Sequence, residues 1–243
     1  MKLSQNFLID ERVAERQIKY ADLNEKDVVL EIGAGKGILT KKIAKIAKVI
    51  AVEIDKKFIS ILKNIDNVEV INEDFLKLDL NELNFNKVIS NIPYHISSPI
   101  TFKLLEKKFE MGILMYQKEF AERMVAIPGT KNYSRLSVMV YYRADCFLLE
   151  KVPKSAFYPV PKVDSYMVKI IPVGRRFEVD ENLFERVVKS LFCHRRKKIK
   201  NSLVIDGLLS KEDAEKIIYG DRRGDSLTPE EIAELCMKME ELK

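Results

Sequence analysis

Short apolar runs that alternate with helical patterns are the feature that most limits what this chain can fold into. The run Val28–Ile32 is compact, rich in β-branched residues and ends at Gly33, which is typical of a buried strand. Residues 38–47 follow, with apolar side chains at helical spacing and lysines on the opposite face. Strands separated by helices need crossover connections, so the pattern predicts a mostly parallel sheet.

The alternation continues to about residue 171. We expect seven strands, at residues 28–32, 49–54, 68–71, 88–89, 113–115, 146–149 and 166–171. We expect helices between and beside them, at residues 11–19, 38–47, 58–62, 117–126 and 136–142. A loop rich in proline and aromatic residues joins the last two strands, which favours an antiparallel edge. The predicted fold class is α/β, a doubly wound, mostly parallel seven-stranded sheet.

A break at Pro172-Val173-Gly174 divides the chain, and helical patterns dominate beyond it, at residues 182–193, 195–204, 211–217 and 229–239. We therefore expect two domains, residues 1–174 and a small all-α C-terminal domain, residues 175–243. The whole chain has a formal charge of +5, but the residues from Arg175 onward include fifteen basic and fifteen acidic side chains. Within this C-terminal part, the basic residues are concentrated in the run 195–200.

Several classes of protein are disfavoured by what the sequence lacks. It has no long apolar stretch and no leader at Met1, so we expect neither a membrane span nor a targeting segment. Cys146, Cys193 and Cys236 are widely spaced without a CxxC or zinc pattern, which predicts no metal site and fits a cytoplasmic protein. A monomer is the default expectation.

A glycine-rich segment, Glu31-x-Gly33-x-Gly35-x-Gly37, lies between the first predicted strand and its helix. Its spacing is not the GxGxxG of dinucleotide-binding folds, and it lacks the Gly-Lys-Ser/Thr of a phosphate-binding loop. Glu53 closes the second strand, where an acid can accept hydrogen bonds from ribose hydroxyls. Asp74 closes the third strand and can accept from an adenine amino group, with Phe75 beside the ring. The set predicts a site for an adenosine without a diphosphate, which favours S-adenosyl-L-methionine.

A second motif, Asn91-Ile92-Pro93-Tyr94, ends the fourth strand. In open α/β sheets ligands bind at the carboxyl ends of the strands. The amide of Asn91 can accept a hydrogen bond from an amino group, and the ring of Tyr94 can stack on a flat base. The motif therefore predicts a site that modifies the exocyclic amine of a nucleobase.

These motifs, together with Gln5-Asn6-Phe7-Leu8 and Phe157-x-Pro159-x-Pro161-x-Val163-x-Ser165, occur in an order that resembles the rRNA adenine N6-dimethyltransferases, in particular the universal small-subunit enzymes of ribosome biogenesis. The resemblance extends from about Leu3 to Ser165. It implies a Rossmann-like class I methyltransferase that uses S-adenosyl-L-methionine. Its target would be two adjacent adenosines near the 3′ end of the small-subunit rRNA in a ribosomal precursor, each dimethylated.

The resemblance also implies roles for individual residues. The cofactor site would be formed by Gln5, Asn6, Leu8, Gly33, Gly35, Glu53, Asp74, Phe75 and Asn91. The target adenine would be held by Asn91, Pro93 and Tyr94, with Phe157 pressing on it from the other side. We expect His95 to be structural or a peripheral contact rather than a catalytic base.

Basic residues of the C-terminal domain are candidate RNA contacts. They are Arg195, Arg196, Lys197, Lys198, Lys200, Arg222 and Arg223. For any one of them a solvated helix face is an equally good interpretation, but the concentrated run favours phosphate binding.

Other functions remain open from the sequence. A large-subunit rRNA methyltransferase of the macrolide-resistance type shares the Asn-x-Pro-Tyr core. An assembly factor that has lost turnover would use the same fold. A DNA adenine methyltransferase is more distant, because the segment Phe157–Ser165 disfavours it.

Overall fold

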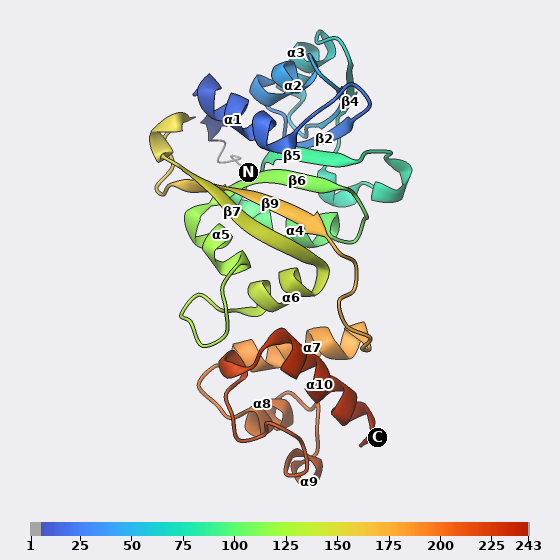
Figure 1. Cartoon of the computed structure of the whole chain (residues 1–243), viewed down its shortest axis with the longest axis vertical. Coiled ribbons are helices and arrows are strands. Elements are labelled where there is room, and N and C mark those ends of the chain that lie inside the picture. The colour runs from blue at the N-terminus through green and yellow to red at the C-terminus, as the bar shows by residue number, and fades with distance from the viewer. Residues whose placement is uncertain (1–5, 243) are drawn as a thin grey trace. The chain divides into compact units, whose positions relative to one another are not determined.

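The computed structural model describes residues 6–242 and contains the predicted seven-stranded sheet (Figure 1). In their order across the sheet the strands are β4 (Val68–Ile71), β3 (Lys48–Val52), β2 (Val28–Ile32), β5 (Lys87–Asn91), β6 (Met111–Gln117), β9 (Ser165–Pro172) and β7 (Ala144–Val152). The pairings from β4 to β6 are parallel, and β9 is antiparallel to both β6 and β7. The α/β class and the antiparallel edge are therefore confirmed.

Helices cover both faces of this sheet. On one face, α1 (Glu11–Ala21), α2 (Ile38–Ile43) and α3 (Ile59–Lys63) bury their apolar side chains against the strands in one continuous core. On the other face lies α4 (Ser97–Leu104), where the hydroxyls of Thr101 and Tyr116 are 2.8 Å apart and both fully buried. Helix α4 was not predicted, because its apolar residues lack a clear helical stripe.

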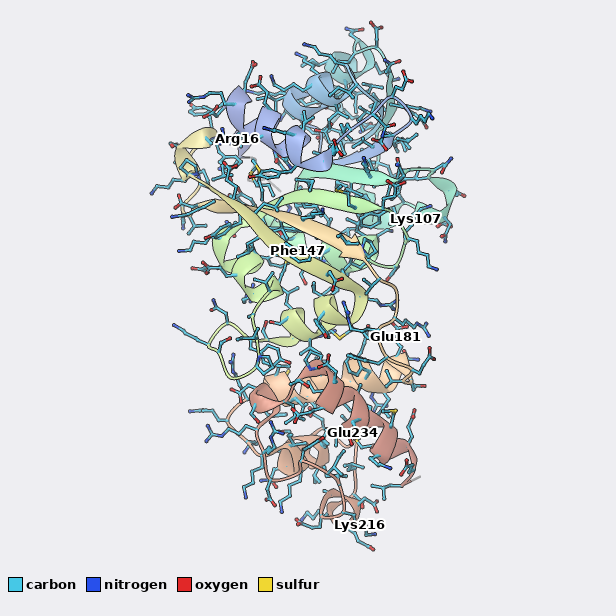
Figure 2. All side chains as sticks on the ribbon, in the orientation of Figure 1. Arg16, Lys107, Phe147, Glu181, Lys216 and Glu234 are labelled. Carbon is cyan, nitrogen blue, oxygen red and sulfur yellow. The ribbon has the colours of Figure 1, made fainter. Side chains whose placement is uncertain are left out.

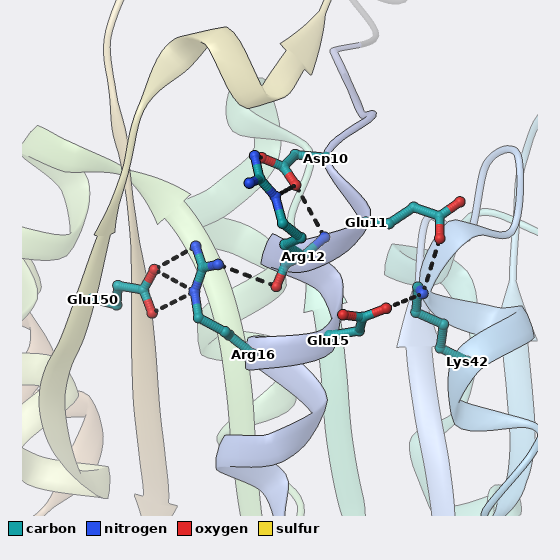
Figure 3. A network of polar contacts seen from close by, with 7 residues as sticks. All are labelled: Asp10, Glu11, Arg12, Glu15, Arg16, Lys42 and Glu150. Atoms are coloured by element: carbon teal, nitrogen blue, oxygen red, sulfur yellow. Dashed lines mark hydrogen bonds and ion pairs between the residues drawn. The ribbon is translucent and has the colours of Figure 1, made fainter.

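Helix α1 is held at its start and along its polar side (Figure 3). Asp10 caps its N-terminus by accepting from the backbone N–H of Arg12. Arg16 donates through Nε to Oε1 of Glu150 in β7, at 2.8 Å. Lys42 of α2 lies 3.1 Å from the carboxylate of Glu11 and 2.8 Å from that of Glu15. These contacts tie α1 to an element on each side of it.

A second, two-stranded sheet was not predicted. It pairs β1 (Phe7–Leu8) with β8 (Phe157–Tyr158) in antiparallel register, Phe7 opposite Tyr158 and Leu8 opposite Phe157. Two residues per strand are too few for an alternating pattern to be visible in a sequence. This pair brings the segment after residue 5 beside the loop between β7 and β9.

The structure divides into two compact units. Unit 1 comprises the described residues up to Ala121 together with Ala144–Val173, and unit 2 comprises Glu122–Arg143 together with the described residues from Gly174 onward. The third crossing between the units follows Val173, close to the boundary that was expected near residue 174. Residues 122–143, which were expected in the first domain, fall in unit 2 because they pack with the C-terminal helices.

Aromatic contacts explain why residues 122–143 belong to unit 2. The ring of Tyr142 lies 5.9 Å from that of Phe177 and 5.0 Å from that of Phe184, between ring centroids. The hydroxyl of Tyr133 donates to the carbonyl of Leu227 at 2.9 Å, and both residues are buried. Such pairs join segments far apart in the sequence, so a local pattern could not reveal them.

The helices of unit 2 are α6 (Arg135–Arg143), α7 (Glu181–Cys193), α8 (Ile199–Ile205), α9 (Lys211–Ala214) and α10 (Pro229–Glu240), while α5 (Lys118–Met124) contains the first crossing between units. Glu181, labelled in Figure 2 at the start of α7, pairs with Arg143 and Arg175. Thr228 and Glu231 form a capping box at the start of α10. No helix among residues 6–242 has both the length and the apolar character needed to cross a bilayer.

Four predicted helices are shorter in the structure, those expected at residues 38–47, 117–126, 195–204 and 211–217. The helix expected at 38–47 ends at Ile43, because the chain turns there to begin β3 at Lys48. The helix expected at 195–204 begins only at Ile199, because Lys198 pairs with Arg223 in an isolated antiparallel bridge.

Candidate active site

A cavity opens where the strand order reverses, between the carboxyl ends of β2 and β5. The hydrogen-bonded register of these strands pairs Val29 with Lys87 and Leu30 with Val88 and does not extend beyond them. The cavity lies beyond that point in unit 1, and its volume is about 360 Å³. Topological switch points of this kind are the usual ligand sites of doubly wound sheets, and the volume suits a small-molecule ligand.

The cavity collects nearly every residue that the sequence predicted for it. Those lining it are Asn6, Leu8, Gly33, Gly35, Glu53, Asp74, Phe75, Asn91, Pro93, Tyr94 and Phe157. Gln5, the remaining prediction, lies outside the described residues. Gly33, Glu53, Asp74 and Asn91 meet because parallel strands end at one edge of the sheet. Asn6 and Phe157, which are 151 positions apart, are brought to the same cavity by the pairing of β1 with β8.

The glycine turn after β2 is built without room for side chains. Gly33 has φ of +73° and Gly35 has φ of +54°, values that L-residues rarely adopt. A Cβ on Gly33 would lie 3.3 Å from Cγ of Pro93, and one on Gly35 would lie 3.1 Å from Cε1 of Phe7. The turn therefore packs directly against both flanking motifs and presents bare backbone to the cavity.

Glu53 follows β3 and holds this turn in place. Its Oε2 accepts from the backbone N–H of Gly35 at 2.7 Å, and its Oε1 accepts from that of Asp55 at 2.8 Å. Each carboxylate oxygen has a further lone pair, so the group can still accept from ribose hydroxyls. The side-chain amide of Asn72 donates to the Glu53 carbonyl at 2.8 Å, which fixes the ends of β3 and β4 together.

Asp74 caps the short 3₁₀ helix Phe75–Lys77, with its Oδ1 accepting from the N–H of Leu76 at 3.0 Å. Its other oxygen makes no hydrogen bond among residues 6–242 and can accept from an amino group. Phe75 is buried beside it and forms part of the cavity wall. An acid, an apolar ring, a second carboxylate with free acceptor capacity and a tight glycine turn together fit an adenosine that carries no diphosphate.

Asn91 is the last residue of β5. Its side-chain Oδ1 is buried and has no hydrogen-bond partner within the described chain. Buried acceptors are nearly always satisfied in folded proteins, so an orphan in a cavity indicates a place for a donor from a ligand. The N–H of Ile92 donates to the Met115 carbonyl at 3.1 Å, which holds the Asn91–Ile92 peptide against β6.

Tyr94 and Phe157 form an aromatic corner of the cavity. Their ring centroids lie 6.4 Å apart at an interplanar angle of 65°. The Tyr94 hydroxyl lies 2.7 Å from that of Ser165, and burial raises the pKa of the phenol, so it is neutral at physiological pH. The rings meet edge to face rather than as parallel walls, so a base pressed between two opposed faces requires one ring to turn.

Asn6 does more than line the cavity. Its side-chain amide donates to the carbonyl of Pro159 at 2.6 Å, so it anchors the loop that follows Phe157. Its amide hydrogen bond and the pairing of β1 with β8 both secure Phe157 at the edge of the site.

Glu31 is a cavity residue whose role the sequence analysis did not assign. It lies in β2, where burial raises the pKa of its carboxyl to about 8, and its Oε2 accepts a 2.6 Å hydrogen bond from the buried hydroxyl of Thr40. An acid inside an otherwise apolar strand was the available signal. The chain therefore carries a second carboxyl near Glu53 that shares the same cavity.

The basic residues predicted to contact RNA are brought together in unit 2. Lys198 is bridged to Arg223, and the N–H of Ile199 donates to the Arg222 carbonyl at 2.9 Å. The two basic segments, which the sequence shows more than twenty residues apart, therefore lie side by side.

Four of these seven residues are already paired with acids in unit 2. The pairs are Arg195 with Asp225 at 3.1 Å, Lys198 with Asp221 at 2.9 Å, Lys200 with Glu215 at 2.7 Å and Arg222 with Glu231 at 2.6 Å. Arg195 also donates to the Thr130 carbonyl at 3.0 Å. Arg196, Lys197 and Arg223 are exposed and form no ion pair in the described part of the chain.

Comparison with known families gives one match across nearly the whole sequence. Residues 1–240 match the family described as ribosomal RNA adenine dimethylase. A protein of Methanosarcina acetivorans, named probable ribosomal RNA small subunit methyltransferase A, is 48% identical over 252 aligned positions, covering 98% of this chain and 93% of that protein. A protein of the same name from Pyrococcus furiosus is 46% identical, covering 96% of this chain and 89% of the relative.

Solved structures show the same similarity. A dimethyladenosine transferase from Plasmodium falciparum superposes with a TM-score of 0.85 at 30% identity, covering 97% of this chain and 98% of that one. The 23S rRNA methyltransferase ErmE superposes with a TM-score of 0.69 at 29% identity, covering 97% of this chain and all of that one. Both are similar over the two units, not over the sheet alone.

Proposed function

This chain belongs to the ribosomal RNA adenine dimethylase family, and we propose on that premise that the cavity holds the target adenine through Asn91, Pro93 and Tyr94. The chain is an S-adenosyl-L-methionine-dependent methyltransferase that dimethylates adenine in small-subunit rRNA. We assign as its targets two adjacent adenosines near the 3′ end of that RNA, each methylated twice during ribosome biogenesis. The substrate is then a precursor of the small ribosomal subunit.

The unfilled acceptor of Asn91 is the observation that carries this assignment. The buried Oδ1 of Asn91 accepts no hydrogen bond from the described chain. An exocyclic amino group has two N–H donors, one of which can fill this acceptor. The carbonyl of Ile92, in the same motif, offers a second acceptor beside it. A ligand with a planar ring and a primary amine satisfies both acceptors and meets the ring of Tyr94, as an adenine does.

The proposed site accelerates methyl transfer by orienting the target amine. The lone pair of the adenine N6 is delocalised into the ring, which makes the amine a weak nucleophile. Acceptance of both N–H groups by Asn91 and Ile92 draws the nitrogen out of the ring plane and localises its lone pair. S-adenosyl-L-methionine supplies an electrophilic methyl group on its sulfonium. The enzyme accelerates an in-line displacement by holding the nucleophile in place, without a covalent enzyme intermediate.

The protonated product amine then loses its proton to water, because a positively charged amine attached to an electron-poor ring is a strong acid. No side chain is required to accept this proton. His95 lines the cavity and is exposed at its rim, which suits a peripheral contact with substrate. After the first cycle the monomethylated amine keeps one N–H, which can still donate to one of the two acceptors, and transfer of a second methyl group with loss of that proton gives the dimethylated product.

We propose that the remaining cavity residues hold the cofactor. Glu53 accepts from the ribose hydroxyls, Asp74 accepts from the adenine amine, and Phe75 packs against the cofactor ring. Gly33 and Gly35 line the cavity with backbone atoms alone, which supports close approach of the cofactor to the chain at this turn. Asn6 and Leu8 close the cavity on the side of β1.

For the contacts with RNA we propose Arg196, Lys197 and Arg223 as the principal phosphate ligands, because they have no acidic partner among residues 6–242. Lys198, Lys200, Arg195 and Arg222 contribute less, since contact with phosphate must compete with their existing ion pairs. We propose a monomer as the acting species. A ribosomal precursor as substrate supports a cytoplasmic location.

The decisive experiment measures methyl transfer from labelled S-adenosyl-L-methionine to unmethylated small subunits, unmethylated large subunits and DNA in parallel. Nuclease digestion then identifies the labelled nucleoside. We expect dimethyladenosine in small-subunit RNA alone, at two neighbouring positions. Label in large-subunit RNA would favour the activity named for the structural relative ErmE. Cofactor binding with no transfer to any substrate would favour an assembly factor.

A further inference from the structure

Ser90, the residue before Asn91, occupies a position that nothing in the proposed mechanism uses. It is fully buried, and its hydroxyl donates to the carbonyl of Ile32 at 2.6 Å. The register between β2 and β5 ends at Leu30 and Val88, so this bond joins the two strands beyond their last paired residues. Ile32 immediately precedes the glycine turn, and Ser90 immediately precedes Asn91.

The carbonyl of the same serine is held from a different direction. Gln17 of α1 is fully buried, and its side-chain Nε2 lies 3.2 Å from the Ser90 carbonyl and 3.0 Å from the Ile113 carbonyl of β6. Only the amide nitrogen can donate to these two carbonyls, which settles the orientation of the side chain. One residue of an outer helix therefore links two strands of the sheet at the level of Ser90.

The cost of this arrangement indicates that the bonds matter. The Oε1 of Gln17 is buried and has no partner within the described chain. A buried acceptor without a donor destabilises the folded state, so an apolar side chain of similar shape would be the more stable choice here. The neighbouring Arg16 ties the helix to Glu150 of β7, which keeps Gln17 in register with the strands (Figure 3).

We propose that Ser90 and Gln17 are positioning residues for Asn91. Ser90 ties the end of β5 to Ile32, directly before the glycine turn that faces the cofactor, and Gln17 fixes Ser90 against α1 and β6. This inference rests on the proposed function of the cavity. The contact of Gly33 with Pro93 shows that the two segments touch, so a shift of β5 relative to β2 moves the acceptor for the target amine relative to the methyl donor. A misplacement of about 1 Å is enough to slow such a reaction about a hundredfold.

The test compares three variants. Ser90→Ala removes the bond to Ile32, and Gln17→Met removes the bonds to Ser90 and Ile113 while also removing the orphan acceptor. Ser137→Ala is the matched control, because the Ser137 hydroxyl is equally buried and donates to the Arg123 carbonyl at the same 2.6 Å, within unit 2. For each we would measure kcat on unmethylated small subunits, the Kd of S-adenosyl-L-methionine by equilibrium titration, and the side-chain amide resonance of Asn91 by NMR.

We expect Ser90→Ala and Gln17→Met to lower kcat by about ten- to a hundredfold, with the Kd of the cofactor changed less than about threefold. The Asn91 resonance should shift in both, and neither change should occur in Ser137→Ala. Gln17→Met should also unfold no more easily than the wild type, which separates the loss of rate from a loss of stability. If Ser90→Ala does not fold, Gln17→Met decides alone.

The inference would be overturned if the kcat of Gln17→Met, and of Ser90→Ala where it folds, equalled the kcat of the control Ser137→Ala. A loss confined to the Kd of the cofactor would overturn it as well, because the bonds would then shape the cofactor pocket only. In either case the wild-type protein still methylates adenosine, so the proposed function stands. Failure of the wild type on every substrate would instead refute the proposed function.

Discussion

The cavity of unit 1 and the basic segments of unit 2 were both identified from the sequence, but the structure treats their polar groups in opposite ways. In the cavity, Asn91 keeps an unfilled acceptor, and burial raises the pKa of Glu31. In unit 2, hydrogen bonds from Lys198 and Lys200 lower the pKa of the Asp221 carboxyl, and Arg195 is bound to Asp225 and Thr130. The open acceptor of Asn91 lies in a cavity and offers a place for a ligand, whereas the cations of unit 2 that are bound to acids stabilise the fold.

The largest effect should come from the unfilled acceptor. We expect Asn91→Ala to lower kcat by about a hundred- to a thousandfold, because a hydrogen-bonding group placed for the transition state contributes on that scale. The Kd of S-adenosyl-L-methionine should rise only modestly, since the other cavity residues remain. Single-turnover methylation of small subunits and equilibrium titration measure the two quantities. A variant that turns over at a near-normal rate would contradict the role assigned to Asn91.

The carboxyl of Glu31 has a raised pKa and that of Asp221 a lowered one, so the two should make stability depend on pH in opposite directions. The folded pKa of Glu31, about 8, exceeds the ordinary 4.5, so the native state keeps a proton that the unfolded state has lost between those values. The free energy of unfolding of the cofactor-free protein should therefore fall as pH rises through this range. Glu31→Gln should remove that loss and stabilise the protein by up to a few kcal/mol at pH 9.

Urea unfolding at pH 5, 7 and 9 measures this effect. Asp221→Asn is the matched control of opposite sign, because a lowered carboxyl pKa stabilises at neutral pH and that contribution is lost as pH falls. Identical pH profiles for Glu31→Gln and the wild type would show that Glu31 is ionised in the folded protein.

The carboxylate of Glu53 accepts two backbone hydrogen bonds, and we expect it to accept further hydrogen bonds from the cofactor. Glu53→Gln should raise the Kd of S-adenosyl-L-methionine by about ten- to a hundredfold, because hydrogen bonds to a charged group contribute about 1.5–3 kcal/mol. Glu73→Gln is the control, since Glu73 is an exposed acid that lines the same cavity. Isothermal titration compares them, and equal losses in the two variants would argue for a general charge effect.

The smallest effects on RNA binding are expected at the basic residues of unit 2, and they should differ between residues with and without an acidic partner. Alanine at Arg196, Lys197 or Arg223 should weaken binding to small-subunit RNA by about two- to tenfold at low salt and reduce the salt slope by about 1 each. Arg195→Ala should instead lower the thermal stability and leave the slope unchanged, because its bonds to Asp225 and Thr130 hold unit 2 together. Binding titrations over a range of NaCl concentration compare the slopes, and a reduced slope for Arg195→Ala would remove the distinction.

The membership of the cavity could be predicted because it depends on strand ends. Gly33, Glu53, Asp74 and Asn91 each follow an apolar run, and parallel strands place such ends at one edge of a sheet. Ser90 and Gln17 could not be predicted in this way. They look like ordinary polar residues in the sequence, and their hydrogen bonds depend on how α1 packs on β5 and β6.

The sequence by itself determined the class of fold, the family, the cofactor and the cavity residues, because periodicity and motif order are local properties of the chain. Tertiary structure alone decided that residues 122–143 belong to unit 2, that four of seven candidate cations are paired, and that Asn91 is left with an open acceptor. Each of these outcomes depends on which distant groups meet when the chain packs. Charges and hydrogen bonds over such separations are settled by three-dimensional distance, which a local pattern does not contain.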